Sequence, residues 1–202
     1  GELYNSGHVT YIRTDSTRTN EDARKTIKEY IKQTYGENHL GPGVLGSDAK
    51  KGSSNVQDAH EAIRPTRPEI HNIDGLKDEQ QLLYRLIWAR FAGSQMSSSI
   101  RETRAIVAKT EDFDKNITGT ASWRTHAGWE AVYEPYHKSI KLEPPQSELA
   151  EGVLWEIECN EENPQLVSDQ TKPPRRFSES SIVQEMKKAG IGRPSTYVST
   201  IQ

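Results

Sequence analysis

Residues 7–17 read Gly-His-Val-Thr-Tyr-Ile-Arg-Thr-Asp-Ser-Thr, and this stretch near the start of the chain decides how the chain is organised. The β-branched part of this stretch, residues 8–13, predicts a short extended run. Side chains two residues apart project to the same face of an extended chain, so Tyr11 and Arg13 are expected side by side. The stretch therefore places a phenol next to a guanidinium.

That pairing has chemical meaning because a tyrosine hydroxyl, with a pKa near 10, is a poor nucleophile without help. Arg13 would stabilise phenolate character at Tyr11, or grip a phosphate oxygen with its planar fork. Asp15 would orient Arg13 or another polar partner. An edge strand with an exposed Tyr-Arg pair, followed by a helix cap, explains the same residues, and spacing alone favours this plainer alternative.

A second motif occupies residues 58–65, Asp-Ala-His-Glu-Ala-Ile-Arg-Pro. Here His60 would hydrogen-bond a phosphate or donate to a leaving oxygen. In the alternative, Glu61 and Arg64 form an ion pair on a helix surface and His60 is solvated. Residues 59–63 are expected to form a short helix-like turn, which the residue before proline closes.

A third motif, residues 190–197, reads Gly-Ile-Gly-Arg-Pro-Ser-Thr-Tyr. Glycines before a helix start let backbone amides approach an anion, and Arg193, Ser195 and Thr196 add charge and hydroxyl donors. The motif suits a grip on the phosphates of a single strand. A tight turn between two helices, with proline at the first helical position, fits equally well.

Helical periodicity is clear in two other places. Thr19 and Asp22 approximate a capping box, which predicts a helix that ends at Gly36. Residues 78–96 show the strongest helical pattern. The apolar side of the first helix comprises Ala23, Ile27, Tyr30, Ile31 and Tyr35. The apolar side of the second comprises Leu82, Leu83, Leu86, Ile87, Phe91 and Met96.

Between and after these helices the pattern changes. Residues 38–58 predict a surface loop. Four segments predict strands of an antiparallel meander or small barrel. These segments are residues 104–109, 117–123, 128–133 and 154–159. A linker is expected at residues 171–176, then a helix from a Ser178 cap through Ala189, and another helix from Ser195. The expected fold class is α+β.

Composition narrows the class of protein. Only 33% of the 202 residues are hydrophobic, which suits several small lobes better than one large core. The net charge is −3, but residues 103–170 carry a net −7 and residues 171–202 a net +4. The last segment is therefore the one expected to face phosphate. With a single cysteine, Cys159, and no HExxH spacing, neither a disulfide framework nor a metal site is expected. No run approaches the roughly 20 apolar residues of a membrane span.

In their order along the chain, these motifs closely resemble type IA DNA topoisomerases, the bacterial topoisomerase I group in particular. Residues 7–17 resemble that family's active-site tyrosine motif and residues 59–66 its second motif. Residues 83–96 resemble the helix that follows, and residues 190–197 a downstream motif. The resemblance runs through essentially the whole chain.

The resemblance implies that Tyr11 attacks a phosphodiester of single-stranded DNA and becomes joined to the 5′ phosphate. The family then passes a strand through the break and reseals it, which relaxes negative supercoils without ATP. The implied catalytic residues are Tyr11, Arg13, Asp15 and His60. The implied DNA-binding residues are Thr10, Arg64, Arg193, Ser195 and Thr196.

The resemblance also sets the expected organisation. Residues 1–102 would form a helical lobe with the tyrosine, residues 103–175 an antiparallel β arch of the family's torus, and residues 176–202 the start of a helical DNA-binding lobe. Nothing in the chain resembles the family's N-terminal Toprim domain, which supplies Mg²⁺ ligands and a glutamate. We therefore expect an inactive central fragment, without bound metal, whose partners are single-stranded DNA and the Toprim domain of the same polypeptide. A monomer in the cytoplasm is expected.

Two other classes of protein share part of this pattern. A relaxase or replication-initiator nuclease also uses tyrosine, but it needs a His-hydrophobe-His metal pair that this sequence lacks. A non-catalytic DNA-binding or clamp module would keep the basic residues 171–202, but would have no use for Tyr11 beside Arg13. Changing Tyr11 to Phe separates a topoisomerase from such a module.

Overall fold

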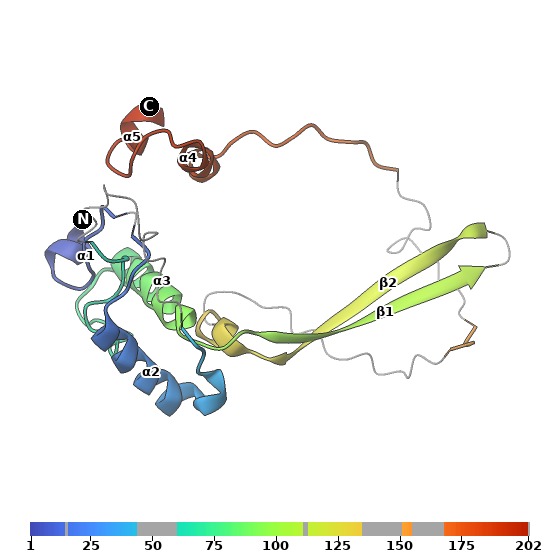
Figure 1. Ribbon diagram of the computed structural model, residues 1–202, viewed down its shortest axis with the longest axis horizontal. Helices are drawn as coiled ribbons and strands as arrows, with labels where there is room; N and C mark the ends of the chain where they lie inside the picture. The colour runs from blue at the N-terminus through green and yellow to red at the C-terminus, as the bar shows by residue number, and fades with distance from the viewer. Residues whose placement is uncertain (15, 44–59, 111–112, 135–150, 155–167, 202) are drawn as a thin grey trace, which may run out of the picture. The chain divides into compact units, whose positions relative to one another are not determined.

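The structure is a computed structural model that describes residues 1–14, 16–43, 60–110, 113–134, 151–154 and 168–201 (Figure 1). The chain divides into two compact units, Gly1–Pro144 and Pro145–Gln202. The first unit combines helices with one antiparallel β ribbon, so the expected α+β class is confirmed. The division into three lobes at residues 102 and 175 stays a prediction.

Helix α2 spans Glu21–Tyr35 and follows the short α1, Glu2–Asn5. Its N-cap is Asn20, whose Oδ1 accepts hydrogen bonds from the amides of Asp22 at 2.8 Å and Ala23 at 3.2 Å. The predicted cap at Thr19 is therefore wrong by one residue, because the asparagine carbonyl reaches the first free amides of the helix. Gly36 ends the helix at φ 94°, as expected, and the turn η1, Glu37–His39, follows.

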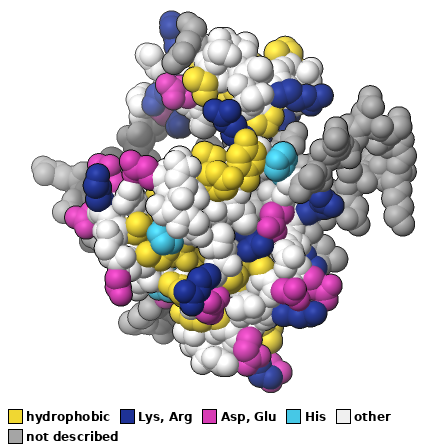
Figure 2. Space-filling view, turned by 90° about the vertical axis from the view of Figure 1, so that its left-hand side faces the viewer, with side chains coloured by type: hydrophobic (Ala, Val, Ile, Leu, Met, Phe, Trp, Pro, Cys, Tyr) yellow, Lys and Arg dark blue, Asp and Glu magenta, His cyan; other side chains and the backbone are white. Residues whose placement is uncertain are grey.

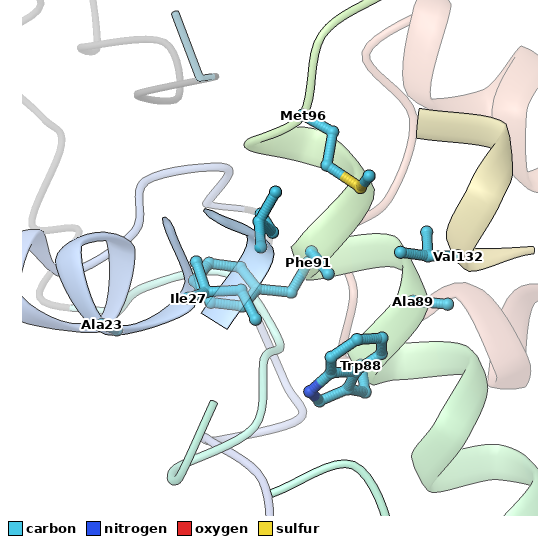
Figure 3. Packing of buried hydrophobic residues seen from close by; sticks show 9 residues of the cluster. Ala23, Ile27, Trp88, Ala89, Phe91, Met96 and Val132 are labelled. Atoms are coloured by element: carbon cyan, nitrogen blue, oxygen red, sulfur yellow. The ribbon is translucent and has the colours of Figure 1, made fainter. Parts of the chain in front are cut away.

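The main core lies between α2 and α3, which spans Asp78–Ser94 (Figure 3). From α2, Ile27 and Ile31 are fully buried, and from α3 the Trp88 ring fills the centre. The indole Nε1 of Trp88 donates to the Pro68 carbonyl at 2.8 Å, which satisfies the one polar atom of that side chain. The cluster comprises Ala23, Ile27, Ile31, Trp88, Ala89, Phe91, Ala92, Met96 and Val132.

The buried side of α3 differs from the predicted one. Leu82, Leu83 and Leu86 are 62%, 52% and 49% exposed, whereas the buried residues are Tyr84, Trp88, Ala89, Phe91 and Ala92. The prediction for the three leucines is wrong because this helix has apolar residues on more than one side. Periodicity cannot tell which side meets a partner, and α2 packs against the aromatic side.

The β region is simpler than predicted. Strands β1, Ile100–Thr110, and β2, Phe113–His126, pair antiparallel with Ile100 opposite His126. They form a two-stranded sheet, and no further strand joins it among the described residues, so the meander or barrel is wrong for them. Residues 155–159 of the fourth predicted strand lie outside the described residues.

The third predicted strand is instead a 3-10 helix, η2, Gly128–Val132. Gly128 has φ 51°, and a Cβ at this position would lie 2.4 Å from the carbonyl oxygen of Ser98. Only glycine tolerates that approach, so the chain turns there and returns to α3. Val132 is then buried in the main core.

The second unit contains α4, Glu179–Lys188, and α5, Tyr197–Ile201. The predicted cap is confirmed, because the Ser178 hydroxyl accepts from the Ser181 amide at 3.3 Å. Residues 168–178 have no regular secondary structure, which agrees with the predicted linker. Helix α5 begins two residues after the expected Ser195, within the usual scatter of helix ends. In the part of the chain that the structure describes, no helix is long and apolar enough to cross a membrane.

Candidate active site

The extended segment that carries Tyr11 pairs with the second motif. Val9 forms an antiparallel bridge with Pro65. The Thr10 amide donates to the Arg64 carbonyl at 2.9 Å, and the Thr66 amide donates to the His8 carbonyl at 3.1 Å. Backbone hydrogen bonds between residues more than 50 positions apart in the sequence therefore hold the two motifs together.

The side chain of Thr10 strengthens this connection. Its Oγ1 donates to the Ala62 carbonyl at 2.8 Å and accepts from the Arg64 amide at 2.9 Å. The hydroxyl has one donor, and that donor is engaged within the protein. The structure thus shows Thr10 as a link between the two motifs, and its contact with DNA stays a prediction.

Tyr11 lies in an aromatic group that is open to solvent on one side. Its ring stacks on His60 with 5.0 Å between centroids and 27° between planes. On another side, the Tyr4 ring meets it edge-on at 5.3 Å. Tyr11 and Tyr4 remain 37% and 40% exposed to solvent. Figure 2 views the side of the molecule on which α1 lies and shows exposed hydrophobic side chains among charged ones.

Tyr4 is a residue that sequence reasoning missed. It lies on α1, seven residues before Tyr11, and no pattern of spacing connects a single helical turn to the extended segment that follows. The contact arises because the chain reverses at Gly7, whose φ of 73° is typical of glycine.

The extended run expected over residues 8–13 does not continue to its end, and the placement of Tyr11 and Arg13 on one face stays a prediction. The chain bends at Ile12 and Arg13, so side chains no longer alternate there as in a strand. Arg13 is exposed and has no hydrogen-bond or ion-pair partner among the described residues. Asp15 lies outside the described residues, so its role stays a prediction.

The second motif is not helical. Residues 60–63 show no helical turn, so the prediction for residues 59–63 is wrong over the described part. The physical reason is tertiary: the Ala62 amide donates outward to the Arg18 carbonyl at 2.7 Å, and Pro65 disfavours a helix before it.

The ion pair of Glu61 and Arg64 exists, but away from any helix. Arg64 donates from Nε and Nη2 to the two Glu61 oxygens at 2.9 and 2.7 Å. Its Nη1 donates to the Pro65 carbonyl at 2.8 Å, and the residue is only 8% exposed. Each guanidinium nitrogen is thus engaged inside the protein, and the contact of Arg64 with DNA stays a prediction.

Glu61 also belongs to this site, although the sequence suggested only a surface ion pair. Its Oε2 accepts from the amide of Asn20, the N-cap of α2, at 3.0 Å. This contact spans 41 residues, so no local pattern could reveal it.

The third motif lies in the second unit and forms a turn between α4 and α5. Gly190 and Gly192 have φ of 72° and 75°. The Arg193 amide donates to the Thr196 hydroxyl at 2.9 Å, which closes the turn. This matches the tight turn that the sequence allowed, although Pro194 precedes α5 by three residues. DNA contact by Arg193, Ser195 and Thr196 stays a prediction.

Within the described residues, no group of three or more His, Cys, Asp or Glu side chains is arranged to hold a metal ion. The Mg²⁺ implied by the family resemblance has no matching ligand set among them. It stays a prediction about the full-length enzyme.

Two distant motifs are thus joined around a partly exposed tyrosine. A family model described as DNA topoisomerase matches residues 1–202. The chain belongs to this family, in its type IA, bacterial topoisomerase I group.

Individual relatives agree with the family assignment. A DNA topoisomerase 1 of Thermotoga maritima is 36% identical over 202 residues, which cover 97% of this chain and 30% of the relative. A DNA topoisomerase 1 of Escherichia coli K12 is 34% identical, over 98% of this chain and 22% of the relative. The chain therefore spans less than a third of the length of these relatives.

A solved structure shares the fold. Full-length topoisomerase I from Thermotoga maritima superposes with a TM-score of 0.68 at 33% identity. The match covers 96% of this chain and 29% of that one.

Proposed function

We propose that this chain is the tyrosine-bearing part of an ATP-independent type IA DNA topoisomerase, which cleaves single-stranded DNA, passes a strand and reseals the break. The position of Tyr11 is the observation that supports this proposal. Its ring is partly exposed and stacked on His60, at the place where two distant motifs are joined by hydrogen bonds.

The reaction is a transesterification. The Tyr11 Oη attacks phosphorus, and the bond between phosphorus and the 3′ oxygen breaks. The phenol loses its proton and the departing 3′ oxygen gains one, which leaves a 5′ phosphate joined to Tyr11. One ester replaces another, so resealing is the reverse step and needs no ATP.

The described residues supply binding and orientation for this step. His60 holds one face of the phenol, and its imidazole would contact the phosphate near the cut. Arg13 is exposed two residues after Tyr11 in the sequence. It would stabilise the negative charge of the phosphate through charge-assisted hydrogen bonds. By family resemblance, Asp15 is an auxiliary catalytic group. Arg193, Ser195 and Thr196 would hold the strand on the far side of the break.

The 202 residues alone are proposed to be inactive. The DNA topoisomerase 1 of Thermotoga maritima is more than three times as long as this chain. The parts of such an enzyme outside these 202 residues would contribute the Mg²⁺ site and the groups that move protons. A monomer in the cytoplasm remains the expectation from the sequence.

A covalent-trapping assay with labelled single-stranded DNA and Mg²⁺ tests the proposal. The chain is assayed alone and together with the N-terminal portion of the Thermotoga maritima relative. We expect adduct only in the mixture and none with Tyr11→Phe. Adduct with the chain alone would contradict the proposed inactivity.

The full-length enzyme with Tyr11→Phe provides the deciding control if the two pieces fail to assemble. Adduct that persists in this variant would show that Tyr11 is not the nucleophile. A DNA-binding module would bind equally well with and without the tyrosine hydroxyl, and would form no adduct in either form.

A further inference from the structure

Tyr11 lies between Thr10 and Arg18, and both of these residues are hydrogen-bonded to Ala62. Before Tyr11, the Thr10 hydroxyl donates to the Ala62 carbonyl at 2.8 Å. After it, the Arg18 carbonyl accepts from the Ala62 amide at 2.7 Å. The segment that carries the nucleophile therefore leaves and rejoins the second motif at Ala62, one residue after Glu61 and two after His60.

The side chain of Glu61 makes this anchor rigid. Its carboxylate accepts from the Asn20 amide at 3.0 Å and from Arg64 Nε and Nη2 at 2.9 and 2.7 Å. The side chains of Arg64 and Glu61 are only 10% and 32% exposed. A partly buried charged pair that is joined by two parallel hydrogen bonds has a narrow range of geometries. The pair thus connects the start of α2 to the backbone next to His60.

These contacts leave Glu61 poorly placed to act on DNA. Its two oxygens accept three hydrogen bonds from protein donors, so the carboxylate is committed to holding other groups. Its neighbour His60 stacks on Tyr11 at 5.0 Å between centroids. Any shift of the backbone at residue 61 would move the imidazole against the phenol.

We propose that Glu61 is a positioning residue: by joining Asn20 and Arg64 it holds the His60 ring against Tyr11 in the orientation that the cleavage step needs. This inference rests on the proposed function of Tyr11 as nucleophile. It assigns a role to a residue that the sequence suggested only as part of a surface ion pair.

The kinetic test uses the full-length enzyme that contains these residues, with Glu61→Ala, Glu61→Gln and the control Glu69→Gln. Glu69 also forms an ion pair with an arginine, Arg67, at 3.2 Å, but this pair is more exposed to solvent than that of Glu61 and Arg64. The rate of adduct formation at saturating DNA and the affinity for single-stranded DNA are measured separately.

We expect Glu61→Ala to slow adduct formation about 10-fold to 100-fold, since small misplacements of catalytic groups have effects of this size. Affinity for single-stranded DNA should stay within about 2-fold, because Glu61 does not touch the strand. Glu61→Gln should slow adduct formation less than Glu61→Ala does, because the amide oxygen of glutamine still accepts from the Asn20 amide. The Glu69 control should match the unchanged enzyme.

A second measurement reports the geometry without relying on activity. In the 202-residue chain, NMR follows hydrogen exchange of the Asn20 amide and the ring signals of His60, which the stacked Tyr11 ring shifts. Glu61→Ala should speed Asn20 exchange and move the His60 signals. Glu61→Gln should preserve the Asn20 protection.

The outcomes separate the two proposals. An unchanged adduct rate in Glu61→Ala, in an enzyme that Tyr11→Phe inactivates, would overturn the positioning role. Weaker DNA binding with an unchanged rate at saturation would overturn it too, because Glu61 would then act on the strand. Adduct that survives Tyr11→Phe would instead refute the proposed function. In that case unchanged Asn20 exchange and His60 signals in Glu61→Ala would also refute the positioning role.

Discussion

At the scale of single residues, the same side chain can serve a substrate or the fold, and its partners decide which. Thr10 was expected at the DNA, yet its hydroxyl links Ala62 and Arg64. The guanidinium of Arg64 is held by Glu61 and the Pro65 carbonyl. By contrast, Arg13 is exposed with no such partner in the described part of the chain. Among these residues, Arg13 alone is exposed, and its contact with phosphate stays a prediction.

Tyr84 illustrates a tyrosine with a structural role. Burial, with a smaller effect from Glu69, raises the pKa of its phenol to about 12, and its hydroxyl donates to the Ile70 carbonyl at 2.7 Å. We predict that Tyr84→Phe lowers the free energy of unfolding by about 1 kcal/mol, because the Ile70 carbonyl loses its donor. Urea denaturation measures this change.

Tyr30→Phe is the matched control for that experiment. Tyr30 packs edge-on against Trp88 at 5.3 Å, and its hydroxyl has no hydrogen bond within the described residues. Its loss should change stability by less than about 0.5 kcal/mol. Equal effects of the two substitutions would contradict a specific role of the Tyr84 hydroxyl.

At the scale of elements, the contact between η1 and the last residue of β2 creates a pH-sensitive junction. The rings of His39 and His126 lie 4.7 Å apart between centroids. Burial, and then the neighbouring His126, lower the pKa of His39 below its ordinary value of 6.5. As the pH falls, the unfolded chain therefore takes up this proton before the folded chain does. The contribution to stability is complete above pH 6.5 and declines below it.

We therefore predict that the melting temperature falls between about pH 8 and about pH 5.5, and that His39→Gln reduces this fall. His71, whose pKa burial also lowers, contributes in the same direction and preserves part of the fall in the variant. Thermal denaturation at the two pH values measures both effects. An identical pH dependence in the variant would show that His39 is not a source of it.

At the scale of the whole molecule, charge is distributed unevenly along the chain. Residues 171–202 carry a net +4, whereas residues 103–170, which include most of the β ribbon, carry a net −7. Electrostatic attraction to phosphate should therefore come from the second unit, where Arg175 and Arg176 are exposed. The acidic region should contribute little to it.

We predict that replacing Arg175 and Arg176 with Gln weakens binding to single-stranded DNA and reduces its salt dependence. The slope of log affinity against log salt should change by about 0.7 for each lost phosphate contact. Replacing Arg104 and Lys109 of β1 with Gln removes the same charge and serves as control. Titrations at several salt concentrations compare the two variants, and an equal loss in both would contradict the assignment.

The sequence by itself determined the family, the α+β class, both ends of α2 to within a residue and the capped start of α4. These features rest on local chemistry: asparagine and serine cap helices, glycine ends them, and the order of the motifs is a linear property. The tyrosine and its companion His60 were also identified, because both are part of those motifs.

Only the tertiary structure decided which side of α3 is buried, and that residues 128–132 form η2 instead of a strand. It also decided that Glu61 and Tyr4 belong to the site. Each of these outcomes depends on a contact between residues whose spacing follows no local period, such as Ile27 with Trp88 or Asn20 with Glu61. The folded chain decides which distant residue buries an apolar side chain or accepts a hydrogen bond. Local periodicity in the sequence does not identify that residue.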